Sequence, residues 1–479
     1  MNILFASLIS GILAGCAFNS TILSVLAWIS LVPLWFALSR CATVKQAVVC
    51  GFVFGVSFNG ACIYWIAHVS LIGLCMMLLY LSLYSIALCV VCRARMRSAY
   101  AILVIPCVWV ILEFLKENVW CGFGWTNLAY SQYENLYFIQ LADVFGAKFI
   151  SFVIVAVNVF LWQALVEKKR RLWTGLLVIV LVCGSLLYSV IRLSTLRTDA
   201  RVAVSVVQPN VAESMKNNVA TESFVTGKLA QLAGLVSKDS LVVFPEAAWP
   251  QVLREDDLSG PAGLVKSLET NTLIGAVTFE AGNFYNSALF FDPQGELRAR
   301  YHKIRLVPFG EYVPLRKMFS FIEVLNSLGD MSRGNELTVF EYEGKTFSTL
   351  ICFEDVFPGF VSRFARNRDF LVNITNDEWF GGQPEARQHL GILVLRAIEN
   401  RRSMVRCANT GTSGWISYKG EIATLTEDTR AVFVEASKTY DLALNRSNSL
   451  YNKWGDFFPL GIIAGVLVWC RRKERSKTP

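Results

Sequence analysis

The sequence predicts a multi-span α-helical membrane domain joined to a separate α/β domain. Of 479 residues, 54% are hydrophobic and only 17% are charged, whereas soluble domains carry about a quarter charged residues. The mean hydropathy is +0.44. Long apolar stretches are confined to residues 1–195 and 456–470, and residues 200–445 mix charged and apolar side chains as a globular domain does.

The membrane domain is expected to contain about seven helices within residues 1–195. A span needs about 20 mostly apolar residues. The candidates are residues 3–18, 21–39, 47–68, 70–91, 99–115, 148–166 and 172–192. Residues 456–470 are the candidate for the final transmembrane helix. The polar exceptions among them are Asn59, Asn158 and Glu113, and Glu113 is expected to face water near a span end. They are too few to predict a transport path.

Basic residues orient these spans. They follow alternate stretches, at Arg40 and Lys45, at Arg93, Arg95 and Arg97, at Lys168, Lys169, Arg170 and Arg171, and throughout the tail 471–479. Positively charged loops stay in the cytoplasm. Both termini are therefore expected inside, and residues 200–445 outside. The net charge of +8 lies largely in these loops, so it does not indicate nucleic-acid binding.

The cysteines predict neither a disulfide framework nor a metal site. Of the thirteen, only Cys352 and Cys407 fall within residues 200–445. Cys407 lies in the apolar stretch "MVRCANT" and is expected to be a buried hydrophobe, which leaves Cys352 as a free thiol. Since no cysteine or histidine spacing is typical of zinc ligands, we expect no metal.

Strands and helices alternate along the external domain. Strands are expected in residues 201–210, 241–250, 272–280, 285–303, 346–355 and 369–377, and helices in residues 212–238, 259–269, 357–368 and 384–402. Hairpins also occur, with a turn at Asp292-Pro293-Gln294-Gly295. This pattern predicts an α/β sandwich in which helices cover packed sheets.

Three residues that suit nucleophilic catalysis follow apolar strands: Glu246, Lys303 and Cys352. Functional side chains on open sheets gather where strands end. A thiol is mostly protonated at neutral pH, so it needs a base or a positive field to react. Glu246 is suited to take the proton. Lys303 and the backbone N–H of Phe353 are suited to stabilise the oxyanion of a tetrahedral intermediate.

Each of the three residues also fits a structural role. Cys352 could be a buried thiol, Glu246 a helix-capping carboxylate and Lys303 an exposed charge at a strand edge. A papain-like pair of Cys352 with His302 or His389 is the rival catalytic arrangement. Neighbouring strand residues point to opposite faces, so only one of His302 and Lys303 can face Cys352. Residue chemistry leaves that choice open.

Four motifs resemble the nitrilase (carbon-nitrogen hydrolase) superfamily: "FPEAAWP", "HKIRLVPFGEYVP", "CFEDVFP" and "NITNDEWFG". With the multi-span domain and the loop "GFGWTNLAYSQ" (122–132), the chain resembles the membrane-fused branch, the apolipoprotein N-acyltransferase family. The resemblance implies a nitrilase-like αββα sandwich. It also implies Cys352 as nucleophile, Glu246 as base and Lys303 as oxyanion stabiliser, supported by Glu311 and Glu354.

The activity implied by the resemblance belongs to lipoprotein biosynthesis. An acyl chain passes from a phospholipid, through a thioester on the cysteine, to the α-amine of the diacylglyceryl-cysteine at an apolipoprotein N-terminus, by a ping-pong mechanism without a cofactor. The enzyme is expected to be a monomer in the bacterial inner membrane, with its catalytic domain on the periplasmic side. The sequence departs from the common family pattern at Phe353, where tyrosine is frequent, and at Asn217, where tryptophan is frequent.

Two segments are expected to contact lipid substrates. Residues 315–332 place Phe319 and Phe321 among charged residues, and this amphipathic pattern predicts either a mobile lid or an ordinary core helix. The second segment is the loop "NDEWFGG" (376–382). It is expected to contact lipid because it contains Trp379, and tryptophan suits a membrane interface.

Two other functions remain open from the sequence. A membrane-anchored nitrilase-type amidase would use Glu246, Lys303 and Cys352 but would need a single anchor. A transporter with an external binding domain would leave Cys352 structural, and the weak polarity of the spans speaks against it.

Overall fold

The computed structural model describes residues 2–166, 171–216, 219–314, 316 and 330–476. Within it the chain separates into two compact units. The helical unit comprises Met1–Thr195, Arg387–Glu399 and Ser449–Pro479. The sandwich unit comprises Leu196–Ala386 and Asn400–Asn448.

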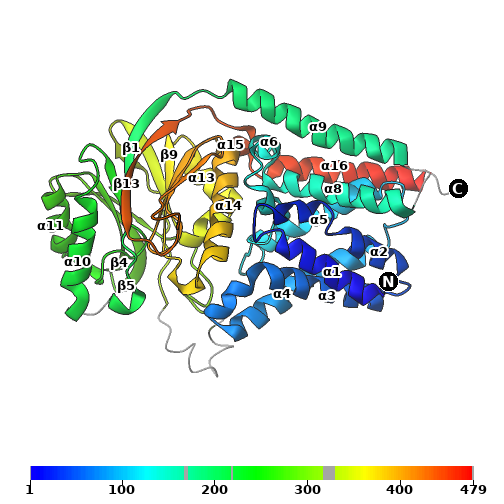
Figure 1. The fold of residues 1–479 in the computed structure, drawn as a ribbon, viewed down its shortest axis with the longest axis horizontal. Helices are drawn as coiled ribbons and strands as arrows, with labels where there is room; N and C mark the ends of the chain where they lie inside the picture. The colour runs from blue at the N-terminus through cyan, green and yellow to red at the C-terminus, as the bar shows by residue number, and fades with distance from the viewer. Residues whose placement is uncertain (1, 167–170, 217–218, 315, 317–329, 477–479) are drawn as a thin grey trace. The chain divides into compact units, whose positions relative to one another are not determined.

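The helical unit is built from long apolar helices (Figure 1). They are α1 (Ile3–Cys16), α2 (Val32–Arg40), α3 (Val44–Ile63), α4 (Leu71–Arg93), α5 (Ala101–Asn118), α8 (Ala147–Val166), α9 (Arg171–Thr195) and α16 (Phe457–Arg475). By length and composition, five stretches among the described residues suit a membrane crossing: Leu23–Arg40, Val44–His68, Leu71–Arg93, Ala147–Val166 and Leu172–Thr195. Short helices connect them, among them η1 (Leu23–Trp28), η2 (Tyr64–His68), η3 (Leu128–Gln132), α6 (Leu136–Ile139), α7 (Ala142–Phe145) and α15 (Leu450–Trp454).

The expected span over residues 21–39 is not one continuous α-helix. It consists of η1 followed by α2, which has Pro33 in its first turn. Proline has no backbone N–H and suits the first turn of a helix, where that donor would be unpaired. The break is closed by Asn158 of α8, whose side chain donates to the carbonyl of Ala27 at 2.9 Å and accepts from the N–H of Leu31 at 2.8 Å.

The expectation that Glu113 faces water is wrong. Its side chain is 3% exposed. One carboxylate oxygen accepts hydrogen bonds from the Trp109 indole at 2.8 Å, the Leu128 N–H at 2.9 Å and the Ser151 hydroxyl at 3.1 Å. Glu113 therefore ties helices α5 and α8 to the turn at Leu128.

The middle of helix α14 (Gln383–Asn400) belongs to the helical unit. Gln388 accepts hydrogen bonds from the indoles of Trp65 at 3.2 Å and Trp125 at 2.8 Å, and it donates to the carbonyl of Cys62 at 2.9 Å. A glutamine with three partners is satisfied although it is buried. The chain therefore passes from one unit to the other within a single helix.

The sandwich unit contains two sheets among the described residues. The first has the order β13-β1-β2-β4-β5-β6, with β3 paired to β4; its strands are β1 (Ala200–Gln208), β2 (Leu241–Val243), β3 (Leu253–Arg254), β4 (Thr272–Glu280), β5 (Asn283–Phe291), β6 (Leu297–His302) and β13 (Ala436–Leu444). The second has the order β12-β11-β10-β9-β8-β7; its strands are β7 (Phe340–Tyr342), β8 (Lys345–Ile351), β9 (Phe370–Thr375), β10 (Ser403–Ala408), β11 (Gly414–Ile416) and β12 (Ile422–Thr424).

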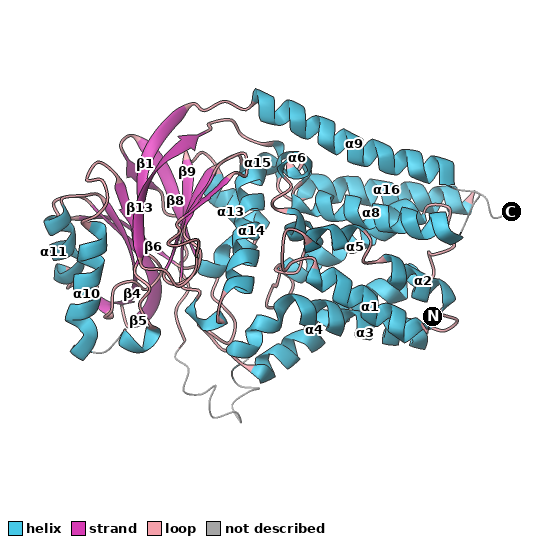
Figure 2. Ribbon diagram, viewed as in Figure 1, coloured by secondary structure: helices cyan, strands magenta, loops and turns pink. Residues whose placement is uncertain are grey.

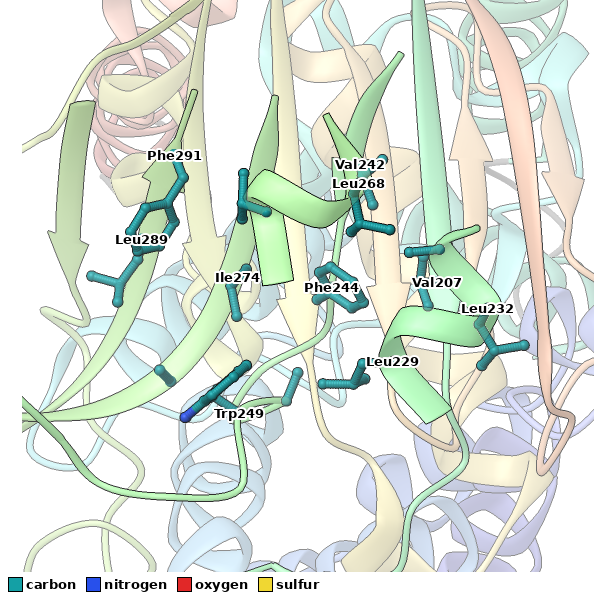
Figure 3. Packing of buried hydrophobic residues seen from close by; sticks show 14 of the residues in the cluster. Val207, Leu229, Leu232, Val242, Phe244, Trp249, Leu268, Ile274, Leu289 and Phe291 are labelled. Atoms are coloured by element: carbon teal, nitrogen blue, oxygen red, sulfur yellow. The ribbon is translucent and has the colours of Figure 1, made fainter. Parts of the chain in front are cut away.

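Helices cover the outer faces of both sheets (Figure 2). Helices α10 (Val219–Ala233) and α11 (Ser259–Leu268) lie on the first sheet, and α13 (Pro358–Ala365) lies on the second. Figure 3 shows the apolar layer beneath α10 and α11, where Leu229 and Leu268 meet Phe244 and Ile274. Full burial of such side chains stabilises the fold by roughly 1.5–3 kcal/mol each.

The inner faces of the two sheets pack against each other. The ring of Phe290 in β5 lies edge-on to Phe340 at 6.0 Å and to Phe347 at 5.8 Å. Cys407 of β10 is fully buried, and its sulfur donates to the carbonyls of Val207 at 3.3 Å and Val243 at 3.1 Å. The order of layers is therefore helix, sheet, sheet, helix, as in the nitrilase-like αββα sandwich.

Candidate active site

Cys352 lies at a sharp turn where strand β8 ends and the short helix η7 (Cys352–Val356) begins. Its φ is +51°, a left-handed conformation that residues other than glycine seldom adopt and that is often found at functional sites. The turn is held by Glu354, which accepts from the Ile351 N–H at 2.8 Å, and by Asn373, which donates to the Cys352 carbonyl at 3.3 Å. The turn leaves Cys352 partly exposed.

Glu246 follows strand β2, in a turn that packs closely on strand β4. A Cβ atom on Gly275 of β4 would lie 2.1 Å from the carbonyl oxygen of Pro245 and 2.8 Å from the Cα of Glu246. No side chain fits there, so glycine is needed at position 275 for the turn to approach the strand. The neighbouring Ala247 has a φ of +45°.

Lys303 follows strand β6 and is 1% exposed. Its ammonium lies 3.1 Å from Oε1 of Glu246 and 3.0 Å from Oε1 of Glu311. Burial alone would lower the pKa of Lys303, but the charges of Glu246 and Glu311 hold it well above its usual value. The ammonium has three donors, and these two contacts with described residues occupy two of them.

Two asparagines that sequence reasoning missed orient the carboxylates. Asn286 of β5 donates to Oε1 of Glu246 at 2.7 Å and to Oε1 of Glu311 at 2.9 Å. The backbone N–H of Asn376, just after β9, donates to Oε2 of Glu246 at 2.8 Å. The sequence feature that could have revealed Asn286 is its position inside the apolar stretch "YNSALFF", where its amide is expected to be buried. Buried polar groups need partners, so such an amide points to a polar neighbour.

Glu311 lies in the loop after Lys303, and its Oε1 is the oxygen that contacts the Lys303 ammonium. Its other oxygen accepts from the Val307 N–H at 2.8 Å. Phe309, within the same loop, has a φ of +62°. Glu311 therefore both closes its own loop and contacts the Lys303 ammonium.

Glu354 joins the Cys352 turn to the Lys303 loop. It is fully buried, and it accepts hydrogen bonds from the Ile304 N–H at 2.7 Å, the Arg305 N–H at 3.0 Å and the Tyr301 hydroxyl at 2.7 Å. Burial raises the pKa of Glu354 to about 7, against the opposing effect of these donors. This carboxylate therefore links the turn that carries Cys352 to the loop that follows Lys303.

The charges of Glu246 and Lys303 both act on the sulfur of Cys352. Burial raises the pKa of the Cys352 thiol well above its usual value, and the negative charge of Glu246 raises it further. Lys303 and a hydrogen bond with Thr375 lower it. On balance these effects favour the protonated thiol, so reaction at the sulfur calls for a nearby proton acceptor.

The histidines of the rival papain-like pair have other partners. Nδ1 of His302 lies 2.8 Å from the Ser287 hydroxyl, and its Nε2 lies 3.4 Å from Glu280. Burial lowers the pKa of His302. His389 belongs to the helical unit, where its ring packs against Trp125 at 5.0 Å.

The remaining expected site residues differ in what the structure describes. Phe353 is 8% exposed, and its ring meets Phe357 edge-on at 5.1 Å. Trp379 lies in the short helix η8 (Glu378–Phe380) and is 55% exposed. Phe319, Phe321 and Asn217 lie outside the described residues.

Comparison with known proteins identifies both parts of the chain. Residues 10–160 match the family "Apolipoprotein N-acyltransferase N-terminal domain", and residues 203–443 match "Carbon-nitrogen hydrolase". A protein of Geobacter metallireducens named apolipoprotein N-acyltransferase is 32% identical, over 98% of this chain and 95% of its own. One of the same name from Chlorobaculum tepidum is 29% identical, over 97% and 95%. The solved CN-hydrolase superfamily protein from Xanthomonas campestris is 18% identical with a TM-score of 0.40, covering 51% of this chain and 91% of that one.

Proposed function

Since this chain belongs to the apolipoprotein N-acyltransferase family, we propose that it moves an acyl chain from a phospholipid to the α-amine of the diacylglyceryl-cysteine at an apolipoprotein N-terminus. The chain is a membrane-embedded acyltransferase with a carbon-nitrogen hydrolase domain. The observation that carries the proposal is the position of Cys352 on a strained turn, under the combined charges of Glu246 and Lys303.

In the first half-reaction, the Cys352 sulfur attacks the carbonyl carbon of a phospholipid acyl ester. Glu246 takes the thiol proton as the C–S bond forms. The tetrahedral intermediate then collapses, the bond to the glycerol oxygen breaks, and Glu246 returns the proton to that oxygen. The products are a thioester on Cys352 and a lysophospholipid.

The oxyanion of that intermediate is stabilised by Lys303 and by the backbone N–H of Phe353. A single donor of this kind accelerates acyl transfer by about 10²–10³. Support comes from the two carboxylates that hold the Lys303 ammonium in place, at 3.1 and 3.0 Å. The ammonium therefore does not have to reorganise as charge develops.

In the second half-reaction, the α-amine of the acceptor attacks the thioester. Glu246 takes a proton from the amine, the new amide bond forms, and the C–S bond breaks. The proton then passes to the departing sulfur and regenerates the thiol. The acyl group is carried by the protein itself, so the scheme is ping-pong and uses no diffusible cofactor.

We place the enzyme, as a monomer, in the bacterial inner membrane, with residues 200–445 as the catalytic domain on the periplasmic side. Residues 1–195 and 456–470 are its membrane part, and the tail 471–479 lies in the cytoplasm with the N-terminus. Each buried CH₂ is worth roughly 0.8 kcal/mol, so a two-chain lipid does not leave the bilayer readily and the active site must be reached from the membrane surface.

A nitrilase-type amidase would use the same Glu246, Lys303 and Cys352. It has less support, because the relatives that match 97–98% of this chain are named for acyl transfer to apolipoproteins. This chain also matches the N-terminal domain of apolipoprotein N-acyltransferases, in addition to the carbon-nitrogen hydrolase domain.

The test is thioester formation on the purified full chain. Incubation with phospholipid should add the mass of one acyl chain at Cys352, and a diacylated lipopeptide should then discharge it as an N-acylated product. Cys352→Ala should abolish both steps, whereas Cys407→Ala, a change at the other cysteine of the sandwich unit, should retain both. Full N-acylation by the Cys352→Ala variant would contradict the proposal.

A further inference from the structure

Three arginines form a cluster on the sandwich unit close to Lys303: Arg305, Arg333 and Arg363. All three are exposed. Among the described residues none of them forms an ion pair with a carboxylate. Several other exposed arginines of this unit are paired, as in Arg201–Asp441, Arg254–Asp256 and Arg298–Asp292. The cluster is therefore a group of three positive charges without a direct ion pair among the described residues.

Aromatic rings hold two of these guanidinium groups in place. The guanidinium carbon of Arg305 lies over the rings of Phe357 at 5.0 Å and Phe360 at 5.8 Å. That of Arg333 lies over Tyr312 at 5.0 Å. A guanidinium stacked on a ring keeps its N–H donors at the edge, free to bind a planar or tetrahedral anion.

Contacts place the three charges near one another. Arg305 lies over Phe360, which precedes Arg363 by three residues in helix α13. The N–H of Gly334, next to Arg333, donates to the Lys303 carbonyl at 2.9 Å. Partial burial lowers the pKa of Arg305, and the charges of Arg363 and Arg333 lower it further. An anion bound among them would relieve this repulsion. The negative charge of Glu354 opposes this effect of the two arginines on Arg305 only in part. Several guanidinium groups gathered together are a feature of phosphate-binding sites.

The cluster is connected to the reacting groups by short contacts. Arg305 follows Lys303 by two residues, and its own N–H donates to Glu354 at 3.0 Å. Phe353, next to the nucleophile, meets Phe357 at 5.1 Å, and Arg305 lies over that same Phe357 ring. Apolar rings therefore run from beside Cys352 to beneath the Arg305 guanidinium.

We propose that Arg305, Arg333 and Arg363 bind the phosphodiester group of the phospholipid acyl donor. This inference rests on the proposed function and deepens it. A guanidinium binds phosphate oxygens through paired N–H donors, and the rings beside it suit the hydrocarbon next to the headgroup. The acceptor carries a diacylglyceryl thioether and no phosphate, so the cluster acts in the first half-reaction alone.

The test compares two acyl donors in one neutral detergent: a zwitterionic phospholipid and a neutral 4-nitrophenyl ester of the same acyl chain. The rate of thioester formation on Cys352 is measured with each. In the Arg305→Gln/Arg333→Gln/Arg363→Gln variant, the phospholipid rate divided by the nitrophenyl-ester rate should fall at least about tenfold, since hydrogen bonds to charged groups are lost. Arg201→Gln, an exposed arginine of the same unit, should leave this ratio unchanged.

A further variant and an inhibition measurement complete the experiment. Arg305→Lys keeps the charge but loses the paired donors, so the ratio should fall part of the way. Inorganic phosphate should slow the phospholipid reaction of the unaltered chain only weakly, because the donor is also held by its acyl chains. Strong inhibition by millimolar phosphate would overturn the assignment to a lipid headgroup and indicate a free-phosphate site.

The failures of the two proposals can be told apart. An unchanged ratio in the triple variant, or an equal loss with both donors, would overturn the phosphodiester site and leave the acyltransferase chemistry intact. No thioester from either donor in the unaltered chain would overturn the proposed function, and this inference with it.

Discussion

At the scale of single residues, two opposite charges act on the pKa of the Cys352 thiol. Glu246 raises the pKa of the thiol, and Lys303 lowers it. Because the same carboxylate also lies 3.1 Å from the ammonium, the two charges are coupled, and each substitution should move the titration of the sulfur in a definite direction.

We expect Glu246→Gln to shift the pH profile for alkylation of Cys352 toward lower pH. Lys303→Gln should shift it toward higher pH, because the positive charge that favours the thiolate is lost. Both variants should lose N-acylation by at least about 100-fold, since each removes a group to which we assign a catalytic role. The rate is measured with iodoacetamide, by mass spectrometry of the peptide that contains Cys352.

Arg201→Gln serves as the control for a lost surface charge and should leave the profile unchanged. Shifts in the same direction for Glu246→Gln and Lys303→Gln would mean that the sulfur does not lie under both charges, and the proposed roles would then be wrong.

At the scale of elements, the site is formed where strands end. Glu246 follows β2, Lys303 follows β6, Cys352 follows β8 and Asn376 follows β9. The first two strands belong to one sheet and the last two to the other. Face-to-face packing of the sheets is therefore what brings the carboxylate, the ammonium and the sulfur together.

We expect Gly275→Ala to reduce thioester formation about tenfold or more. The added Cβ would overlap the turn that carries Glu246, and overpacking of this kind costs about 1–3 kcal/mol of unfolding free energy. Initial rates and thermal unfolding are compared with the unaltered chain.

The matched control is Gly227→Ala in helix α10, where an added Cβ meets nothing within 4 Å. It should stabilise the helix by about 0.5–1 kcal/mol and leave the rate unchanged. Normal activity of Gly275→Ala would show that close approach of the Glu246 turn to β4 is dispensable.

At the scale of the whole molecule, one chain carries both a membrane-embedded part and a carbon-nitrogen hydrolase domain. Five described stretches suit a membrane crossing, and the basic residues near them predict which side each end reaches. The sandwich unit carries every proposed catalytic residue, so its side of the membrane decides which substrates it meets.

In intact cells, a membrane-impermeant maleimide should label a cysteine introduced as Asp256→Cys, in the sandwich unit. It should label Lys473→Cys, in the C-terminal tail, only after the membrane is disrupted. Both positions are exposed, so the difference reports the side of the membrane. Each labelled peptide is identified by mass spectrometry, because native cysteines also react. Labelling of Lys473→Cys in intact cells would reverse the proposed orientation.

The sequence by itself determined the class of the fold, the family and the candidate triad. Apolar stretches long enough to span a membrane, strand–helix alternation and contiguous motifs are local properties, so they can be read along the chain. Glu246, Lys303 and Cys352 could be singled out because each follows an apolar stretch within such a motif.

Only the tertiary structure decided what depends on neighbours from distant parts of the chain. It placed Lys303, and not His302, beside Glu246. The register of β5 and β6 pairs His302 with Ser287, and the two side chains are in contact. It also showed Asn286 between two carboxylates and Glu113 buried among donors. These outcomes follow from which strands and helices pack together, and side-chain type alone does not specify that packing.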